Sequence, residues 1–442
     1  MISAALLALL AASCAGPTVD GGARPGQPRS GGLPPVPTLP SLRGEPGAED
    51  MGGPLQRRPI PPDGTVRVAI LLPFTGTSAE LAASMFNAAE MAVFEIANDK
   101  FILMPFDTTD APEGAAAAAE KAIRSGAQVI LGPLLAPSVE AVAPLARSAD
   151  VHVIAFSNST SVAGDGVFIM GFVPQQQVDA IVDYATAKGL MRQSVLAPQD
   201  AYGSAVVDTM RATLQPRNGA LVRTQFYNPA DEDLTNDVKK IADYDQRRRA
   251  LLEQRAMLQR QQDEVSRQAL KRLEKRDTIG DVDFDALLLP DTGQRLRSTA
   301  SLLSYYDVDL PAVRLLGLRN WDEIPKPESE PALIGAWFAA PAPAERQRFE
   351  TRFKEAFGRA PVRLASLAYD ATALAAVLAQ ESAEPRFSFQ ALTNQNGFLG
   401  VDGLFRLDPT GVAQRKFAIL EIRKNGVQMI QAPPTAFAPA TN

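Results

Sequence analysis

The sequence predicts an α/β protein with two Rossmann-like lobes, each built on a parallel sheet, and a cleft between the lobes. Three observations predict this class. Short apolar runs alternate with segments of helical period from Thr65 onward, which is typical of βαβ units whose helices cover both faces of a sheet. The alternation restarts near Ser194, and the 442 residues exceed one ordinary domain. Two α/β lobes in one chain leave a cleft where parallel strands end.

The first repeat opens with V-R-V-A-I-L-L, a run apolar enough to be buried on both faces. The segment after it carries apolar residues at helical spacing, and strand-like and helical segments alternate from there. The expected strands are Val66–Leu72, Phe101–Phe106, Gln128–Leu131 and Val151–Phe156. The expected helices are Ala79–Asn98, Gly114–Arg124 and Ser138–Arg147.

The second repeat has the same pattern and ends in antiparallel strands, since Asn425-Gly426 is a strong hairpin signal. Its expected strands are Ser194–Ala197, Leu221–Phe226, Asp285–Leu289, Val313–Leu316, Leu333–Phe338, Gly403–Leu407, Lys416–Ile422 and Val427–Ile430. Its expected helices are Tyr202–Leu214, Gly293–Tyr306, Glu345–Phe357 and Ala365–Ala379. We therefore assign residues 63–173 and 341–400 to lobe one, and residues 174–340 and 401–431 to lobe two.

A long charged insertion, Asp245–Arg276, separates two strands of lobe two. It has no Gly or Pro and would form a helix of about 48 Å if it were continuous. It contains ten Lys and Arg residues and five Asp and Glu residues. Gln residues occupy positions where a coiled coil needs apolar ones, so the segment is a poor coiled coil. It is either a solvated helical arm or a cationic docking arm for a protein or an anionic polymer. In both cases we expect it to be dispensable for folding.

The first residues are typical of an export signal. The apolar run in Met1–Ala12 is too short to span a bilayer, and Cys14, the chain's single cysteine, follows small residues as in a bacterial lipobox. Ala11 stands where Leu is usual, and no Lys or Arg precedes the run. We expect residues 1–14 to be a lipoprotein signal ending at a lipidated Cys14; the alternative is a plain secretory signal.

Residues 15–62 have the composition of a disordered tether, with 12 Pro and 10 Gly among 48 residues. Such a segment cannot bury enough apolar surface to offset its chain entropy. Residues 432–442 are also Pro-rich and are expected to form a disordered tail. The sequence thus predicts a folded head held away from a membrane by a lipid anchor.

Composition argues against several function classes. A net charge of −6 disfavours nucleic-acid binding, which needs a cationic footprint. One Cys and one His, His152, exclude a Cys/His zinc site and an intrachain disulfide by counting. His152 lies inside an apolar strand and is expected to be a packed core residue. No P-loop, G-x-G-x-x-G, H-E-x-x-H or G-x-S-x-G string occurs, so we expect neither an enzyme nor a cofactor or metal.

Several strings in the head resemble a known fold. They are V-A-I-L-L-P-F-T-G, V-I-L-G-P-L-L, F-V-P-Q-Q-Q-V-D-A, F-D-A-L-L-L-P, A-Y-D-A-T-A-L and G-L-F-R-L. In this order and spacing, residues 64–431 resemble the type I periplasmic binding fold of leucine and branched-chain amino-acid receptors. The closer resemblance is to the C-terminal domain of outer-membrane lipoprotein activators of penicillin-binding proteins, the LpoA type. The helical-repeat domain that precedes it in the best-known activator is replaced here by the tether.

The resemblance implies a non-catalytic lipoprotein that activates a class A penicillin-binding protein in peptidoglycan synthesis. That synthase would be its protein partner. An Asp directly after the lipidated Cys would retain a lipoprotein in the inner membrane. Because Ala15 stands there instead, we expect the protein to be in the outer membrane, facing the periplasm. The alternative is a substrate-binding receptor of an ABC transporter for a small polar, amino-acid-like ligand. An enzyme is a third hypothesis with no set of catalytic residues behind it.

Candidate ligand contacts follow the predicted strands. In receptors of this fold, the polar loop after strand four holds a ligand carboxylate, and an aromatic residue, here Tyr202, closes over the ligand. Hydroxyl and amide groups suit the first role, although the same residues favour turns and helix caps, and the tyrosine could equally serve packing. The candidates of this kind are Thr75, Thr77, Ser78, Ser157, Asn158, Ser159, Thr160 and Tyr202.

Three further cleft candidates are Gln175, Arg319 and Asn320. The resemblance places acidic residues of amino-acid receptors in these two segments, where they hold the substrate ammonium. A partly desolvated ammonium needs a carboxylate partner, so the change argues against tight binding of free amino acids. We expect Asp370, near the beginning of the last long helix, to be a helix-start residue.

Overall fold

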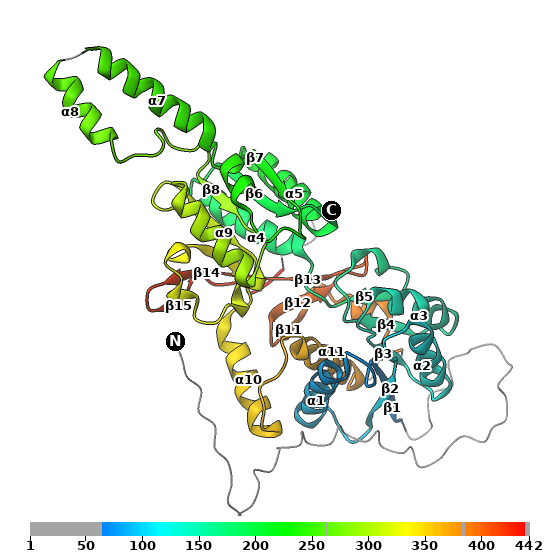
Figure 1. The fold of residues 1–442 in the computed structure, drawn as a ribbon. Helices are drawn as coiled ribbons and strands as arrows, with labels where there is room; N and C mark the ends of the chain where they lie inside the picture. Colours follow the sequence, from blue (N-terminus) through cyan, green and yellow to red (C-terminus); the bar gives the residue numbers. More distant parts are fainter. Residues whose placement is uncertain (1–63, 262, 382–384, 438–442) are drawn as a thin grey trace, which may run out of the picture. The chain divides into compact units, whose positions relative to one another are not determined.

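The computed structural model describes residues 64–261, 263–381 and 385–437 (Figure 1). The predicted signal peptide, Cys14, the tether and residues 438–442 lie outside these ranges, and predictions about them stay predictions. Within the described residues, no helix is both long and apolar enough to cross a membrane.

The first sheet has five parallel strands in the order β2-β1-β3-β4-β5. Alternation along β1 explains why it needs a layer on each face. Val68, Ile70 and Leu72 belong to one buried cluster, and Ala69 and Leu71 to another. The strands are β1 Val66–Leu72, β2 Phe101–Asp107, β3 Val129–Leu131, β4 His152–Ala155 and β5 Val167–Ile169.

Helices cover both faces of the first sheet. Helix α2, Pro112–Arg124, and helix α3, Ala136–Ser148, pack in the cluster that contains Leu71. Helix α1, Ala79–Ile96, and helix α11, Ala365–Ala379, pack together in the cluster that contains Ile70. Helix α10, Pro343–Phe357, lies against α1 through buried Phe side chains.

The second sheet has seven strands in the order β15-β14-β10-β9-β8-β6-β7. Strands β6 to β10 are parallel, whereas β14 is antiparallel to β10 and forms a hairpin with β15. The Asn425-Gly426 turn connects that hairpin, which confirms the prediction from the sequence. The strands are β6 Arg192–Pro198, β7 Ala220–Tyr227, β8 Ala286–Leu288, β9 Arg314–Gly317, β10 Trp337–Ala340, β14 Ala418–Arg423 and β15 Gly426–Gln431.

Two pairs of helices cover this sheet. Helix α4, Pro174–Ala187, and helix α5, Ala201–Leu214, pack in the same cluster as Ile70 of the first sheet. Helix α6, Thr235–Ile241, and helix α9, Gly293–Tyr305, cover the other face. The α/β class and the parallel strands predicted from the sequence are confirmed.

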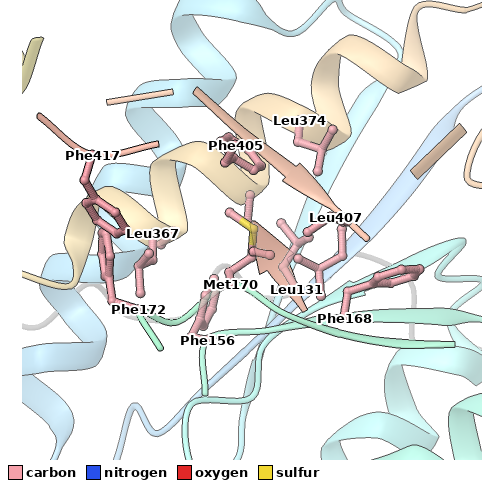
Figure 2. Close-up of a cluster of buried hydrophobic side chains, with 14 of the residues drawn as sticks. Leu131, Phe156, Phe168, Met170, Phe172, Leu367, Leu374, Phe405, Leu407 and Phe417 are labelled. Carbon is pink, nitrogen blue, oxygen red and sulfur yellow. The ribbon is translucent and has the colours of Figure 1, made fainter. Parts of the chain in front are cut away.

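One hydrophobic cluster contains side chains from both large sheets. Leu131 comes from the first sheet, Leu316 from the second, and Leu367 and Leu374 from α11. Figure 2 shows part of this cluster, where Phe156, Phe168, Met170, Phe172, Phe405, Leu407 and Phe417 lie together. The two sheets therefore share a continuous apolar core.

A third, small antiparallel sheet contributes to the same core through Phe405 and Leu407. Its strands are β11 Phe398–Gly400, β12 Gly403–Leu407 and β13 Ala413–Arg415, and helix α12, Phe389–Leu392, precedes it. The strand expected at Leu333–Phe338 begins only at Trp337, because Pro331 starts a short 3₁₀ helix and Gly335 has a φ of +85°.

The charged insertion is not one continuous helix. It forms helix α7, Tyr244–Gln261, and helix α8, Glu264–Leu273, which contact each other as a hairpin (Figure 1). Asp263 explains the break, because its carboxylate accepts a hydrogen bond from Ser266 N and caps α8. The sequence missed this signal because no Gly or Pro marks the turn.

The base of the hairpin belongs to the folded core, contrary to our expectation that the whole insertion is dispensable. The Arg247 and Leu251 side chains of α7 are buried. The Arg247 guanidinium donates to Gly280 O at 2.9 Å and to Tyr306 O at 3.0 Å. Only the part beyond Leu251 can be removed without losing these contacts.

Candidate functional site

Three predicted contact residues, Thr75, Thr77 and Ser78, lie in the turn after β1, where neighbouring carboxylates hold them. Thr75 Oγ1 donates to Asp107 Oδ2 at 2.7 Å, and Thr77 Oγ1 donates to Asp110 Oδ2 at 2.8 Å. Hydrogen bonds from Thr77 and Ser78 lower the pKa of the Asp110 carboxyl. These hydroxyl donors stabilise the turn, which is the alternative that the sequence left open for them.

The loop after β4 divides into inward-bonded and exposed residues. Ser157 is buried, and its Oγ accepts a hydrogen bond from Ser159 N at 3.1 Å. Ser159 Oγ is in turn 2.8 Å from Ser161 Oγ. Asn158 and Thr160 have exposed side chains. The Ser157 and Ser159 side chains thus stabilise the loop, whereas those of Asn158 and Thr160 remain accessible to a ligand.

The residues at the carboxyl ends of the second sheet's strands gather around Tyr202. Tyr202 is 37% exposed, and partial burial together with the carboxylates of Asp291 and Asp200 raises its pKa to about 12. Arg319 opposes that shift. Asn320 belongs to the same group, because its Nδ2 donates to Asp291 O at 3.0 Å. The structure therefore brings together three predicted residues, Tyr202, Arg319 and Asn320.

Asp291 is a member of this group that the sequence reasoning missed. Its Oδ2 accepts a hydrogen bond from Tyr227 OH at 2.6 Å, and its Oδ1 accepts one from Thr292 N at 2.8 Å. Its negative charge acts on Tyr202, which weakens our argument that the cleft lacks an acid. Its place directly after the β8 strand was the available signal, since ligands bind where parallel strands end.

The three glutamines at the start of α4 have different roles. Gln176 bonds to β13, with Nε2 donating to Ala413 O and Oε1 accepting from Arg415 N, both at 2.8 Å. Gln177 Oε1 accepts from Arg319 N at 2.9 Å. Gln175 Oε1 is buried and has no hydrogen-bond partner among the described residues. Gln176 and Gln177 therefore fix the backbone where α4, β13 and the end of β9 meet.

A set of arginines surrounds Phe172 at this junction. The guanidinium carbon of Arg319 lies 4.3 Å from the centre of the Phe172 ring, and those of Arg415 and Arg363 lie at 4.6 and 5.5 Å. Burial lowers the pKa of Arg319 and of Arg415. Arg319, which we predicted as a cleft contact, is held by these packing contacts and by an ion pair with Glu323 at 3.4 Å.

Carboxylates at the same junction connect the helices of the first sheet to the second sheet. Asp322 lies in the 3₁₀ helix Arg319–Glu323 after β9, 3.5 Å from Arg346 of α10 and 3.7 Å from Arg363 before α11. Burial raises the pKa of Asp322. Asp402 is fully buried and pairs with Arg363 at 3.2 Å. We call these four side chains the junction network.

Asp370 does not start a helix, contrary to our prediction. It lies within α11, is fully buried, and accepts a hydrogen bond from Val401 N at 2.7 Å. Its Oδ2 lies 4.0 Å from Arg415 Nη1. Burial first, and then the charge of Asp402, raises the pKa of Asp370 to about 7. The helix begins five residues earlier, at Ala365.

Neither the arrangement nor the residue types form a metal centre in the described part of the chain. No group of three His, Cys, Asp or Glu side chains among residues 64–261, 263–381 and 385–437 could hold a metal ion. His152 begins β4 half-buried, with its ring 6.0 Å from that of Phe168. The polar groups that this site offers to a ligand are the Tyr202 hydroxyl and the Asp291 carboxylate.

Sequence comparison finds a family match for part of the chain. Residues 65–246 match a family model described as periplasmic binding protein. A Rickettsia prowazekii (strain Madrid E) protein, described as uncharacterized protein RP748, is 26% identical over 179 residues, or 40% of this chain. The match spans 47% of that relative, so the chain covers about half of its length.

Solved structures extend the likeness over most of the chain. A putative branched-chain amino acid ABC transporter protein from Rhodospirillum rubrum aligns with a TM-score of 0.65 and 15% identity, covering 83% of this chain and 100% of that one. A solute binding protein from Rhodopseudomonas palustris BisB5, in complex with 3,4-dihydroxybenzoic acid, aligns with a TM-score of 0.55 and 17% identity, and the alignment covers 84% of this chain and 97% of that one. LivJ from Streptococcus pneumoniae, in complex with isoleucine, aligns with a TM-score of 0.54 and 16% identity, and the alignment covers 84% of this chain and 100% of that one.

These alignments cover most of the chain. Identities below 20% establish a shared fold and do not identify a ligand. Together with the parallel strands, the restarted βαβ pattern and the family match, they show that the chain has the type I periplasmic-binding-protein fold, with additional helices.

Proposed function

We propose that the protein is a non-catalytic binding protein of the bacterial cell envelope that activates a class A penicillin-binding protein. The fold is one of binding proteins, which supports the absence of catalysis. The observation that carries the proposal is the junction network. Asp322 pairs with Arg346 and Arg363 across the two halves of the head, and such partly buried pairs favour one arrangement of the lobes.

A transport receptor opens and closes around its ligand, so contacts that favour one arrangement of the lobes count against that role. The hydroxyls of Thr75 and Thr77 support the activator role, since they donate to Asp107 and Asp110 instead of being free for a ligand. The resemblance of the strings in the head to the activator group points the same way. Binding would favour the active state of the synthase through differential affinity.

The test is the rate of glycan polymerisation. The full chain, purified in detergent, is added to a class A penicillin-binding protein from the same bacterium, and consumption of the lipid-linked precursor is followed. We expect faster polymerisation, saturating with the added protein, and direct binding by calorimetry. A synthase that neither binds the chain nor changes its rate would contradict the proposal.

We propose that the exposed basic side chains of the α7–α8 hairpin contact the synthase. The insertion carries a net charge of +5, from ten basic and five acidic residues, in a chain of net −6. Arg249, Arg260, Lys271 and Arg272 are exposed on it. A cationic projection speeds encounter with an acidic surface, and the effect weakens as salt rises.

Charge reversal tests this contact. The Arg249→Glu, Arg260→Glu double variant should bind the synthase more weakly at low salt and almost equally at high salt. The matched control, Lys121→Glu, Lys354→Glu, makes the same charge change on exposed residues of α2 and α10. If both variants lose affinity equally, net charge and not the hairpin governs binding.

We also propose that Cys14 carries a lipid anchor and that the protein faces the periplasm from the outer membrane. The short apolar run, the single cysteine and the Pro/Gly-rich stretch after it support this location. The match to a family of periplasmic proteins agrees with an envelope location.

Substrate binding for an ABC transporter is the second candidate, favoured by the cluster of Tyr202, Asp291 and Asn320 at the strand ends. Calorimetry with leucine, glutamate, alanine and benzoate distinguishes the two roles. A micromolar dissociation constant, or about 8 kcal/mol of binding free energy, that the Asp291→Asn variant abolishes would support the receptor. No heat of binding with any of the four favours the activator.

A further inference from the structure

Strand β15, Gly426–Gln431, forms one end of the seven-stranded sheet (Figure 1). It pairs with β14 on one side, and no strand among the described residues pairs with it on the other. A strand in this position presents a row of unpaired backbone N–H and C=O groups, to which another strand can add. Proteins usually protect such edges, so an unprotected edge indicates a pairing surface.

The other edges of the two large sheets have features that prevent strand addition. β2 contains Pro105, which has no backbone N–H, and β5 is only three residues long. β7 carries Arg223, which forms ion pairs with Asp243 and Asp283. β15 has six residues, G-V-Q-M-I-Q, with neither a charge nor a proline. Of these four edges in the described part of the chain, β15 is the one without such protection.

Two half-exposed apolar side chains lie along β15. Val427 is 41% exposed and Met429 is 45% exposed. The residues opposite them on β14 are Ile422 and Leu420, which are fully buried in the cluster that α6 and α9 cover. Opposite residues of an antiparallel pair point to the same face of the sheet. Val427 and Met429 therefore extend that apolar layer to the edge, where the described residues leave it partly uncovered.

The β14–β15 hairpin determines which backbone groups point outward. Its two-residue loop closes on the pair Arg423 and Gly426. The closing pair of such a loop is hydrogen-bonded, and hydrogen-bonded and non-hydrogen-bonded pairs then alternate along the ladder. The backbone N–H and C=O groups of Gly426 and Gln428 therefore point toward β14, whereas those of Val427 and Met429 point to the open edge.

A second copy of the same strand fits this pattern. When two copies of β15 lie antiparallel about a two-fold axis at Gln428, Val427 of each copy is opposite Met429 of the other. Both residues have outward-pointing backbone groups, so each such pair exchanges two hydrogen bonds. The same pairing places the half-exposed side chains of both copies together on one face. No like charges meet within the paired strands, because residues 426–431 carry no charge.

We propose that β15 is an interface between two copies of this chain, which pair antiparallel about Gln428 and join their second sheets into one. A two-fold pairing of this kind is self-complementary and closed, so it gives a dimer and not a fibre. One strand from each copy buries less surface than a standard interface, so the dimer is weak and depends on concentration.

This interface is separate from the strand-end cluster. In the second sheet, β14, β10 and β9 lie between β15 and β8, the strand that precedes Asp291. The proposal therefore does not depend on which of the two functions above is correct.

Site-specific crosslinking tests the register. The experiment uses the full chain with Cys14→Ser, which removes the chain's single cysteine and the proposed lipid attachment with it. In this background, Gln428→Cys should form a disulfide-linked dimer under mild oxidation, because residues facing each other across the axis have Cα atoms about 4.5 Å apart. Gln431→Cys is the matched control on the same strand. Its two copies would lie about 20 Å apart in this register, too far for a disulfide.

Sedimentation of the same background at rising protein concentration measures the association. We expect a reversible dimer with a dissociation constant of about 100 µM or lower. The Val427→Lys, Met429→Lys double variant should weaken dimerisation at least about tenfold, because the pairing places like charges directly opposite each other. The matched control, Val265→Lys, Met257→Lys, makes the same changes at exposed positions of α8 and α7 and should leave the dimer unchanged. Circular dichroism checks the fold of each variant.

Three results would overturn the proposal. A chain that stays monomeric up to about 500 µM lacks the interface. Equal crosslinking of the Gln428→Cys and Gln431→Cys variants would mean that the strands do not pair about Gln428. A dimer that the folded lysine double variant forms as readily as the unchanged strand would lie elsewhere on the surface. If the lysine double variant does not fold, the two cysteine variants decide.

Discussion

Replacing Asp370 with asparagine should stabilise the protein at high pH and leave its stability nearly unchanged at low pH. Burial and the neighbouring Asp402 raise the pKa of Asp370 from 3.8 to about 7 in the folded protein, although Arg415 lowers it. The folded protein therefore keeps a proton that the unfolded chain releases at lower pH. Stability from this group is complete below about pH 4 and is lost as the pH rises through about 7.

The size of the effect follows from the shift. About three pKa units between 3.8 and 7, at about 1.4 kcal/mol each, give at most about 4 kcal/mol. Asparagine has nearly the same shape, keeps an oxygen for Val401 N, and has no proton to lose in this range. The stability difference between variant and wild type should therefore grow from near zero at about pH 4 to its full value above about pH 8.

Urea unfolding of both proteins at several pH values measures the difference directly. Asp208→Asn is the matched control, because the Asp208 side chain is 74% exposed and pairs with Arg211 on the helix surface. Its effect should be small and similar at every pH. The reasoning is refuted if Asp370→Asn lowers stability by the same amount throughout, because the carboxylate would then be ionised and stably paired with Arg415 over the whole range.

Three other changes test the fold and the anchor. Cys14→Ser should move the protein from the membrane fraction to the soluble fraction, and an unchanged distribution on cell fractionation argues against a lipid anchor. Replacing residues 252–275 with a short Gly/Ser bridge should leave the melting temperature nearly unchanged. Replacing residues 245–276 should lower the melting temperature by several degrees, because the buried Arg247 and Leu251 side chains at the hairpin base are lost. Arg415→Met should destabilise the protein by about 3 kcal/mol in urea unfolding, since it removes a buried guanidinium that donates to Met170 O at 3.0 Å. A loss of stability below about 1 kcal/mol would show that this guanidinium and its hydrogen bond are dispensable.

The sequence predicted the strands and helices best where one local pattern decides the structure. The run Val66–Leu72 was predicted with its observed bounds, because a strand covered on both faces is continuously apolar. The β14–β15 hairpin was predicted from Asn425-Gly426, whose preferred turn connects antiparallel strands. Each of these two signals is contained in a short stretch of sequence.

The candidate site was predicted less well, because its polar residues are defined by partners far apart in the chain. Thr75 and Thr77 looked available, yet Asp107 and Asp110, more than thirty residues later, use their hydroxyls. Asp370 looked like a helix start, yet its burial depends on the later β11–β12 turn. Residue type and spacing do not specify such distances, so the sequence named the right kinds of residue without their partners.

The shared hydrophobic core has a consequence for how the head loses its structure. Side chains of both large sheets belong to one buried cluster, so separating the sheets exposes apolar surface on each. The free energy of that exposure couples their unfolding, and calorimetry should show a single cooperative transition rather than two. A chain cut after β5 would present the Ile70 face of the first sheet to water, so neither lobe is expected to remain soluble when expressed without the other.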